Sequence, residues 1–219
     1  ITDNASISEG SKIESPENYV FTFPPSTAKL LAKNNIKIVN LGNNHIGNFG
    51  EEGIASTKKY LDEMGISYFG QPREARSDNE DAKWGNISFI SYNEFSGDLP
   101  EKIAKKIKKE KAKGQTVFIY THWGEEYVPP LERVKKLAYS FIDAGAEIVI
   151  GSHPHIVQES EVYKDKSIYY SLGNFIFDQY WNKEVSTGLV LELNIKNKKI
   201  NVIEHKVSLN KDGTTCPIN

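Results

Sequence analysis

The sequence predicts a mixed α/β fold, because short apolar segments that suit buried strands alternate with longer segments whose apolar residues recur at helical spacing. A second observation concerns residues 188–209, where two alternating stretches flank a polar turn at Asn197 and Lys198. This pattern predicts an antiparallel hairpin at the carboxyl-terminal end. A chain of 219 residues is long enough for a substantial core, so we expect a single domain spanning residues 1–219.

Local signals predict the individual elements. Residues 19–23 alternate enough for one short strand, and a helix is expected to follow with Ser26 as its N-cap and with Leu30 and Leu31 on its buried side. Further strands are expected over residues 36–41, 66–69, 87–92, 116–121, 147–150 and 167–172. Further helices are expected over residues 51–64, over residues 100–113, and from Leu131 to Ile142 before Gly145. The charged segment 71–81 is predicted to be a surface connection.

Charge and cysteine content exclude several functional classes. The 27 basic and 29 acidic residues give a formal charge of -2, so no nucleic-acid partner is expected. The lysine-rich run 102–113 is interpreted as the solvated face of an amphipathic helix. No apolar run is long enough to cross a bilayer. Cys216 is the only cysteine, which excludes an intrachain disulfide and a thiolate metal cluster.

Histidines follow three of the predicted strands. The pair His153 and His155 comes directly after an apolar strand, and His45 and His122 follow two other strands in the same way. In open α/β sheets the strand ends are where ligands and cofactors collect. Because imidazole nitrogen is a common ligand of divalent transition metals, the pattern predicts one shared metal centre.

Each of these side chains has a simpler structural explanation when it is considered alone. Asn44 is a candidate oxygen ligand, but it stands beside Gly42 and Asn43 at a strand end, where asparagine often only accommodates tight backbone geometry. A single histidine is often a hydrogen-bonded structural residue, and His205 in the predicted hairpin is interpreted in this way. The joint occurrence of Asn44 with the strand-end histidines favours the metal site.

Four ordered motifs resemble those of the CapA family. They are residues 41–45 (LGNNH), 121–127 (THWGEEY), 151–155 (GSHPH) and 170–178 (YSLGNFIFD), and the similarity extends from about Tyr19 to Leu209. Such ordered agreement is more specific than any single motif. The CapA family is associated with poly-γ-glutamate capsule biosynthesis and is related to the calcineurin-like metallophosphoesterases.

The resemblance implies a metallophosphatase-like α/β/β/α sandwich with a site for two divalent transition ions, Mn, Fe or Zn, at the strand ends. It implies that His45 contacts the scissile group and acts as a general acid. The metal ligands that it implies are Asn44, His122, His153 and His155. Three further residues are assigned to the pocket, namely Asn43, Glu126 and Asn174.

The sequence also departs from the family pattern. Family members draw early ligands from an amino-terminal Gly-Asp strand and from an acidic motif that resembles Asn-Leu-Glu, and neither precedes Ile1. We therefore expect the N-terminal strand and the acidic motifs to be missing from this sequence. Asn48 stands where the family commonly has aspartate. The resemblance also implies an extracytoplasmic location at the cell envelope, with a membrane anchor in a segment absent from this sequence.

The resemblance implies metal-assisted hydrolysis or transfer at a phosphoester or a γ-glutamyl amide. The expected partners are an anionic polymer or phosphoester substrate and the membrane proteins of capsule synthesis. The alternative is a non-catalytic envelope subunit that binds polyglutamate or partner proteins. Its binding groove would be lined by Trp123, Tyr127, Tyr180 and Trp181. Aromatic residues near strand ends are more often packing residues, so the groove is the less favoured interpretation.

Overall fold

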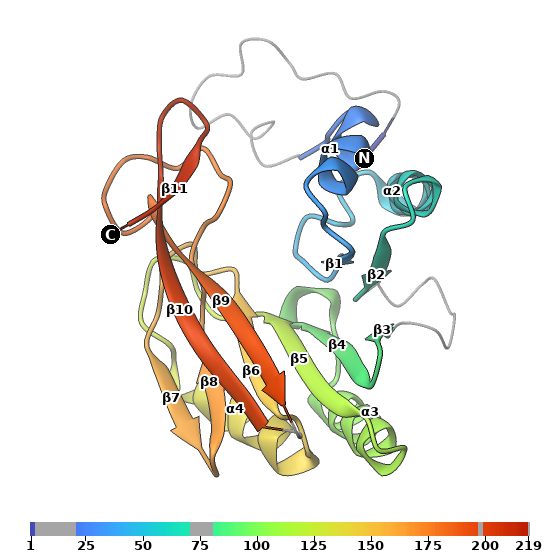
Figure 1. The fold of residues 1–219 in the computed structure, drawn as a ribbon, viewed down its shortest axis with the longest axis vertical. Helices are drawn as coiled ribbons and strands as arrows, with labels where there is room; N and C mark the ends of the chain where they lie inside the picture. Colours follow the sequence, from blue (N-terminus) through green and yellow to red (C-terminus); the bar gives the residue numbers. More distant parts are fainter. Residues whose placement is uncertain (3–20, 71–80, 197–198, 219) are drawn as a thin grey trace.

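A computed structural model describes residues 1–2, 21–70, 81–196 and 199–218 and has the predicted mixed α/β architecture (Figure 1). Its largest sheet consists, in spatial order, of β3 (Ala82–Trp84), β4 (Ile87–Asn93), β5 (Thr116–His122), β6 (Ile148–Ser152), β8 (Lys166–Tyr169) and β7 (Ser160–Tyr163). The four central strands are parallel, and the edge strands β3 and β7 are antiparallel to their neighbours. The carboxyl ends of the parallel strands therefore meet at one edge of the sheet, where open α/β sheets bind ligands.

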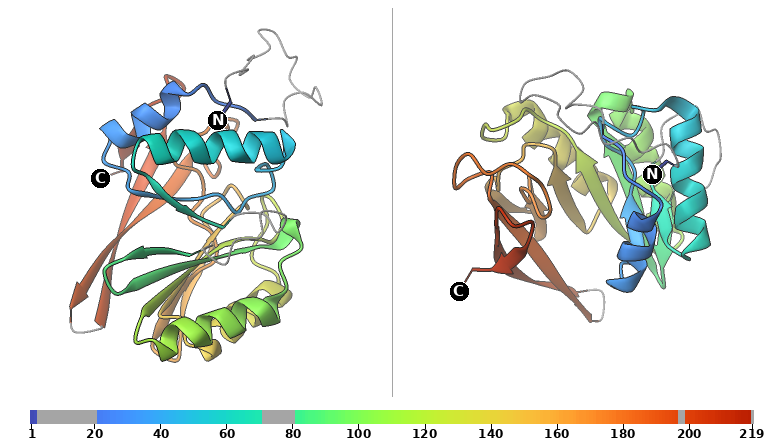
Figure 2. Two further views of the ribbon diagram at one scale, coloured as in Figure 1. Left: turned by 90° about the vertical axis from the view of Figure 1, so that its right-hand side faces the viewer. Right: turned by 90° about the horizontal axis from the view of Figure 1, so that it is seen from above.

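One face of this sheet is covered by two helices (Figures 1 and 2). They are α3 (Pro100–Ala112) and α4 (Glu132–Ala144). Helix α4 buries Val134, Ala138 and Phe141 at the spacing of one helical face, and these side chains pack in one cluster with Ile119 of β5. Gly145 caps α4 with a left-handed φ of 114°, as the sequence predicts.

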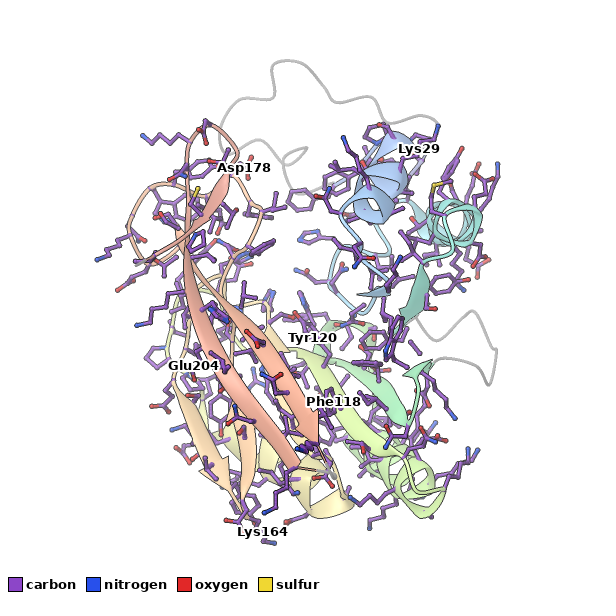
Figure 3. All side chains as sticks on the ribbon, in the orientation of Figure 1. Lys29, Phe118, Tyr120, Lys164, Asp178 and Glu204 are labelled. Carbon is purple, nitrogen blue, oxygen red and sulfur yellow. The ribbon has the colours of Figure 1, made fainter. Side chains whose placement is uncertain are left out.

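The opposite face of the sheet packs against a long antiparallel hairpin (Figure 3). The hairpin is formed by β9 (Thr187–Lys196) and β10 (Lys199–Leu209), and β11 (Thr215–Pro217) pairs with the end of β10. Phe118 of β5 and Leu189 of β9 are buried in the same cluster. The predicted terminal hairpin is confirmed, and its predicted turn at Asn197 and Lys198 lies outside the described residues.

The amino-terminal part forms a separate small layer. It contains α1 (Ser26–Lys33), β1 (Ile38–Asn40), α2 (Gly50–Glu63) and β2 (Ser67–Phe69), and the two strands are parallel. A cluster of Leu41, Leu61 and Ile66 lies between these elements. Helices α1 and α2 lie on the other side of the molecule from α3 (Figure 2). The α/β class is confirmed, whereas the finer assignment to a metallophosphatase-like sandwich stays a prediction.

The start of the chain differs from the sequence-based expectation. Ser26 is the first residue of α1 and not its N-cap, because Pro25 already has helical dihedral angles and no side chain caps the helix. Leu30 is 58% exposed, since adjacent residues are about 100° apart around a helix and Leu31 occupies the buried side. Residues 21–23 form no strand, and residues 19 and 20 lie outside the described part of the chain.

Three short strands were not predicted from the sequence. Strands β3, β7 and β11 have only three or four residues each, too few to establish an alternation. The predicted strand 167–172 ends at Tyr169 as β8. Most of the predicted connection, residues 71–80, lies outside the described residues. Among the described helices, none is long and apolar enough to cross a membrane.

Glu147, just before β6, connects two elements through its carboxylate. It pairs with Lys111 of α3 and Lys166 of β8, and its side chain is 11% exposed. Burial alone would raise the pKa of Glu147, but hydrogen bonds from the two lysines outweigh burial and lower the pKa. A lowered folded-state pKa contributes stability above the unfolded value, and this contribution is lost as the pH falls through the folded pKa.

Glu147→Gln is therefore expected to lower the free energy of unfolding by about 1–2 kcal/mol at pH 7, with a difference that shrinks below about pH 4. Urea unfolding at several pH values measures both quantities. Asp143→Asn is the control, because the Asp143–Lys164 pair is largely exposed and contributes little. An equal loss in the two variants would contradict the expected role of the Glu147 pairs.

Candidate metal centre

The carboxyl ends of β4, β5 and β6 bring polar side chains into register. Asn93 lies opposite His122, and His122 lies opposite Ser152. The loop after β6 then carries His153, whose ring centroid is 4.8 Å from that of His122. Histidines from two separate sequence motifs are therefore adjacent. Asn93 and Ser152 were not predicted as site residues, although each ends a strand beside a histidine motif.

The paired histidines have unusual backbone conformations. His153 has a φ of 102° and His155 a φ of 61°, and nearby Tyr127 has a φ of 63°. Residues other than glycine rarely adopt positive φ, which costs about 1–3 kcal/mol and occurs most often at functional sites. The loop is held by a hydrogen bond in which the Tyr127 backbone N–H donates to the Pro154 carbonyl at 2.9 Å. The fold thus holds the backbone of both histidines in a strained conformation.

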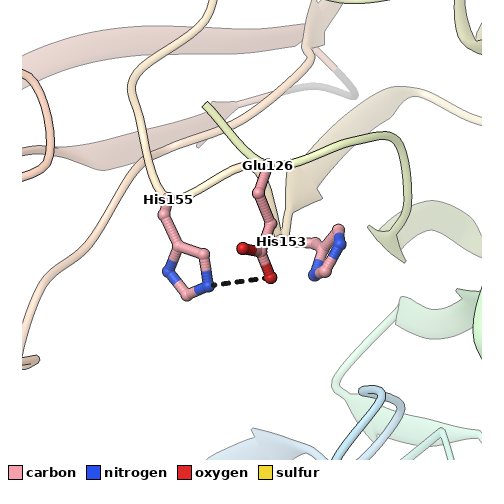
Figure 4. Close-up of side chains that lie close together, drawn as sticks. All are labelled: Glu126, His153 and His155. Carbon is pink, nitrogen blue, oxygen red and sulfur yellow. Dashed lines mark ion pairs between the residues drawn. The ribbon is translucent and has the colours of Figure 1, made fainter. Parts of the chain in front are cut away.

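Glu126 adds a carboxylate to the histidine pair (Figure 4). Each of Glu126, His153 and His155 offers one ligand atom, and these atoms all lie within 4.8 Å of one another. The His155 Nε2 and Glu126 Oε1 atoms are 3.9 Å apart, with the histidine side chain 20% exposed and the glutamate 42% exposed. The sequence placed Glu126 only in the pocket, whereas the structure brings its carboxylate beside both imidazoles.

His122 lies between two polar side chains. Its Nδ1 is 3.2 Å from Ser152 Oγ, and its Nε2 is 3.1 Å from Asn44 Oδ1. Ser152 donates its hydroxyl proton to the Thr121 carbonyl at 2.8 Å, so it accepts from Nδ1–H of His122. In that tautomer Nε2 carries a lone pair, and the side-chain amide of Asn44 lies beside it. An imidazole nitrogen and an amide oxygen can therefore be offered to one cation at this point.

The electrostatics of the site favour neutral imidazoles. Burial, which has the largest effect, and the neighbouring His153, His155 and His45 together lower the pKa of His122 to about 3. Burial also lowers the pKa of His153, although the carboxylate of Glu126 opposes this effect. A neutral imidazole is the form that coordinates a metal, so these rings need not lose a proton before they bind one.

His45 belongs to the amino-terminal layer and lies outside the group of three ligand atoms. Its backbone N–H donates to Asn43 Oδ1 at 2.8 Å, and the Asn43 carbonyl accepts from Asn93 Nδ2 at 2.9 Å. The Asn48 atom 3.2 Å from His45 Nδ1 also accepts from the Phe21 backbone N–H, which identifies it as oxygen. His45 Nδ1 therefore donates to Asn48, and Nε2 is the nitrogen left for other contacts.

Asn174 contacts His155 from the side away from Glu126. Its Oδ1 is 2.8 Å from His155 Nδ1, and its Nδ2 donates to the Val185 carbonyl and to Gln179 Oε1. Asn174 is 7% exposed. Gln179 was not predicted, because its contact with the site depends on how the loop after β8 folds.

Aromatic rings surround the histidines. Phe95 lies 4.4 Å from His153 between ring centroids, and Tyr127 stacks on His155 at 5.8 Å. Trp181 contacts Tyr127 and is 62% exposed. Trp123 is fully buried, and its indole N–H donates to the Tyr170 carbonyl, so it is a packing residue, as the favoured interpretation expects, and does not line a groove. Tyr127 and Trp181 are exposed beside the site, and Tyr180 is partly buried.

Comparison with known proteins places the chain in a family. The family model described as bacterial capsule synthesis protein PGA_cap matches residues 4–179. The chain belongs to this family. The match agrees with the CapA resemblance that the sequence motifs indicate.

Curated relatives support the same assignment. The capsule biosynthesis protein CapA of Bacillus anthracis is 34% identical over 188 residues, which cover 75% of this chain and 46% of that protein. The PGA biosynthesis protein CapA of Bacillus subtilis (strain 168) is 31% identical over 184 residues, 75% of this chain and 48% of that protein. A probable polyglutamine synthesis accessory protein of Mycobacterium tuberculosis is 23% identical over 168 residues, with 63% of this chain and 44% of that protein covered. The chain spans about half the length of these curated relatives.

Proposed function

We propose that the chain contributes a metal-dependent hydrolase or transferase site to the synthesis of a poly-γ-glutamate capsule. Family membership and the names of the relatives support the process. The metal chemistry is supported by the convergence of Glu126, His153 and His155 near the strand ends. This convergence is the observation on which the proposal depends. The proposed substrate is an anionic polymer or a phosphoester, cleaved at a γ-glutamyl amide or a phosphoester bond.

The donor set fits a divalent transition ion. Imidazole nitrogen and carboxylate oxygen suit Zn, Fe and Mn, and ligands about 2.1 Å from one ion lie roughly 3–4 Å from each other. The ligand atoms of Glu126, His153 and His155 lie within 4.8 Å of one another, so side-chain adjustments of about 1 Å would bring them to this spacing. Asn44 Oδ1 and His122 Nε2, 3.1 Å apart, already have the separation of neighbouring ligands.

The proposed ligands are therefore Asn44, His122, His153 and His155, with Glu126 as an addition. A bound ion would act as a Lewis acid toward a substrate oxygen. In the complete protein we propose two such ions.

The other residues would orient the substrate and move a proton. His45 donates from Nδ1 to Asn48, so its Nε2 is the atom that would hold a proton for the leaving group. Phe21 packs against His45 with ring centroids 4.5 Å apart and restricts the ring. The exposed rings of Tyr127 and Trp181 would exclude water along one side of the substrate.

The remaining context is proposed from the family. Poly-γ-glutamate is made for the cell surface, so we propose a cell-envelope location, a membrane anchor outside this sequence, and membrane partners of capsule synthesis. The chain spans about half the length of the curated relatives, so location and partners are proposals.

The experiment is metal analysis of the purified full-length protein together with chelation. We expect near-stoichiometric transition metal. We also expect loss of turnover of bis(p-nitrophenyl) phosphate or of a γ-glutamyl anilide with a chelator, and recovery with Mn, Fe or Zn. A metal-free protein with chelator-resistant turnover would contradict the proposal. A metal-free, inactive protein that binds polyglutamate would support the alternative of a binding subunit.

A further inference from the structure

The hydrogen bonds of Asn174, which contacts His155, allow only one assignment of donors and acceptors. The Val185 backbone carbonyl can only accept, so the Asn174 atom 2.9 Å from it is the Nδ2 amide nitrogen. The same nitrogen lies 3.1 Å from Gln179 Oε1, which accepts its second proton. The orientation of the Asn174 amide is thereby fixed by a backbone group.

This orientation determines the tautomer of His155. With Nδ2 committed to Val185 and Gln179, the Asn174 atom 2.8 Å from the imidazole is Oδ1, which can only accept. His155 must then carry its proton on Nδ1. Its Nε2 is left with a lone pair, and this is the ring atom that faces Glu126 at 3.9 Å.

The network also restricts the ring from outside. Gln179 Nε2 donates to the Tyr127 hydroxyl at 2.9 Å, and the Tyr127 ring stacks on His155 with 24° between the planes. The imidazole is therefore held at Nδ1 by Asn174 and on one face by Tyr127, and both holding residues are connected through Gln179. Burial of Asn174 keeps competing water away from the Nδ1 hydrogen bond.

We propose that Asn174 is a positioning residue that makes Nε2 of His155 the metal-ligating atom, an inference that rests on the proposed metal site. Hydrogen bonds to the non-ligating nitrogen orient metal-bound histidines, and their removal commonly weakens metal binding 10–100-fold. Asn174 thus determines which nitrogen is offered to the ion before any ion binds.

Two measurements test the inference. Long-range ¹H–¹⁵N NMR of the metal-free full-length protein reports the tautomer of His155, and competition with a chromogenic chelator reports the affinity for Zn²⁺. We expect Nδ1–H in the wild type, and in Asn174→Leu we expect a loss of that preference with Zn²⁺ affinity weakened about 10–100-fold. Wild-type Nε2–H, or wild-type Zn²⁺ affinity in Asn174→Leu, would overturn the inference.

Two further variants separate positioning from folding. Asn174→Asp keeps the acceptor oxygen and is expected to keep the Nδ1–H tautomer, which decides the question if Asn174→Leu does not fold. Gln179→Leu leaves the Val185 contact in place, so the Nδ1–H tautomer is expected to stay as in the wild type. A switch to Nε2–H in Asn174→Asp would count against the inference. A wild type that binds no Zn²⁺ overturns the proposed function, whereas the NMR tautomer still tests Asn174 independently.

Discussion

Replacing His153 with alanine is expected to lower metal-dependent turnover of the full-length protein about a hundredfold or more, and to weaken Zn²⁺ binding to a similar degree. Its imidazole is one of three groups with ligand atoms within 4.8 Å, and its ring adjoins that of His122. Alanine leaves water as the only replacement ligand. Steady-state rates on the two chromogenic substrates and chelator competition measure the effects.

His205→Ala is the matched control for this prediction. His205 is a half-exposed histidine on the β9–β10 hairpin, where its Nε2 is 3.0 Å from Glu192. Its removal is expected to leave turnover and Zn²⁺ affinity unchanged. Equal turnover and Zn²⁺ affinity in His153→Ala and the wild type would refute the proposed metal site.

Replacing Gly151 with alanine is expected to lower the free energy of unfolding by about 3 kcal/mol or more. A Cβ atom there would lie 1.9 Å from the Tyr170 carbonyl oxygen and 2.7 Å from Trp123 Nε1. These two atoms form a buried hydrogen bond, so the new methyl group must separate backbone segments that support the loop of His153. Denaturant unfolding of the variant measures the loss.

Gly47→Ala is the control for the glycine variant. A Cβ at Gly47 would meet nothing within 4 Å. Its effect on stability is therefore expected to stay within about 0.5 kcal/mol. Similar stabilities for the two variants would show that the space around Gly151 adapts, contrary to the close contacts of β6.

Long periodic elements were predictable because their signals are local. In helix α4 the spacing of Val134, Ala138 and Phe141 predicts the buried face, and Gly145 predicts the end of the helix. Leu30 was misplaced because two adjacent leucines do not reveal which of them faces the core. The short strands β3, β7 and β11 form by pairing with neighbouring strands. Three or four residues are too few for this pairing to be recognised in the sequence.

The candidate site was predictable to the extent that its residues recur at strand ends. His122 and His153 could be grouped because each follows an apolar strand, and the structure brings their rings together. Asn93 could not be assigned to the site from the sequence, because its hydrogen bond to the Asn43 carbonyl depends on how the two layers pack. Trp123 packs in the core, as favoured for aromatic residues near strand ends, but the acceptor for its indole N–H could not be read from sequence position.

The separation of the donors along the chain has a consequence for folding. Asn44 and His122, whose side chains meet at 3.1 Å, are 78 residues apart in sequence and belong to different layers. Bringing them together requires closure of a long loop, and the entropy of that closure is recovered only through packing of both layers. Neither half of the chain can therefore present all of the proposed ligands by itself, and the proposed centre is complete only when the amino-terminal layer is packed against the six-stranded sheet.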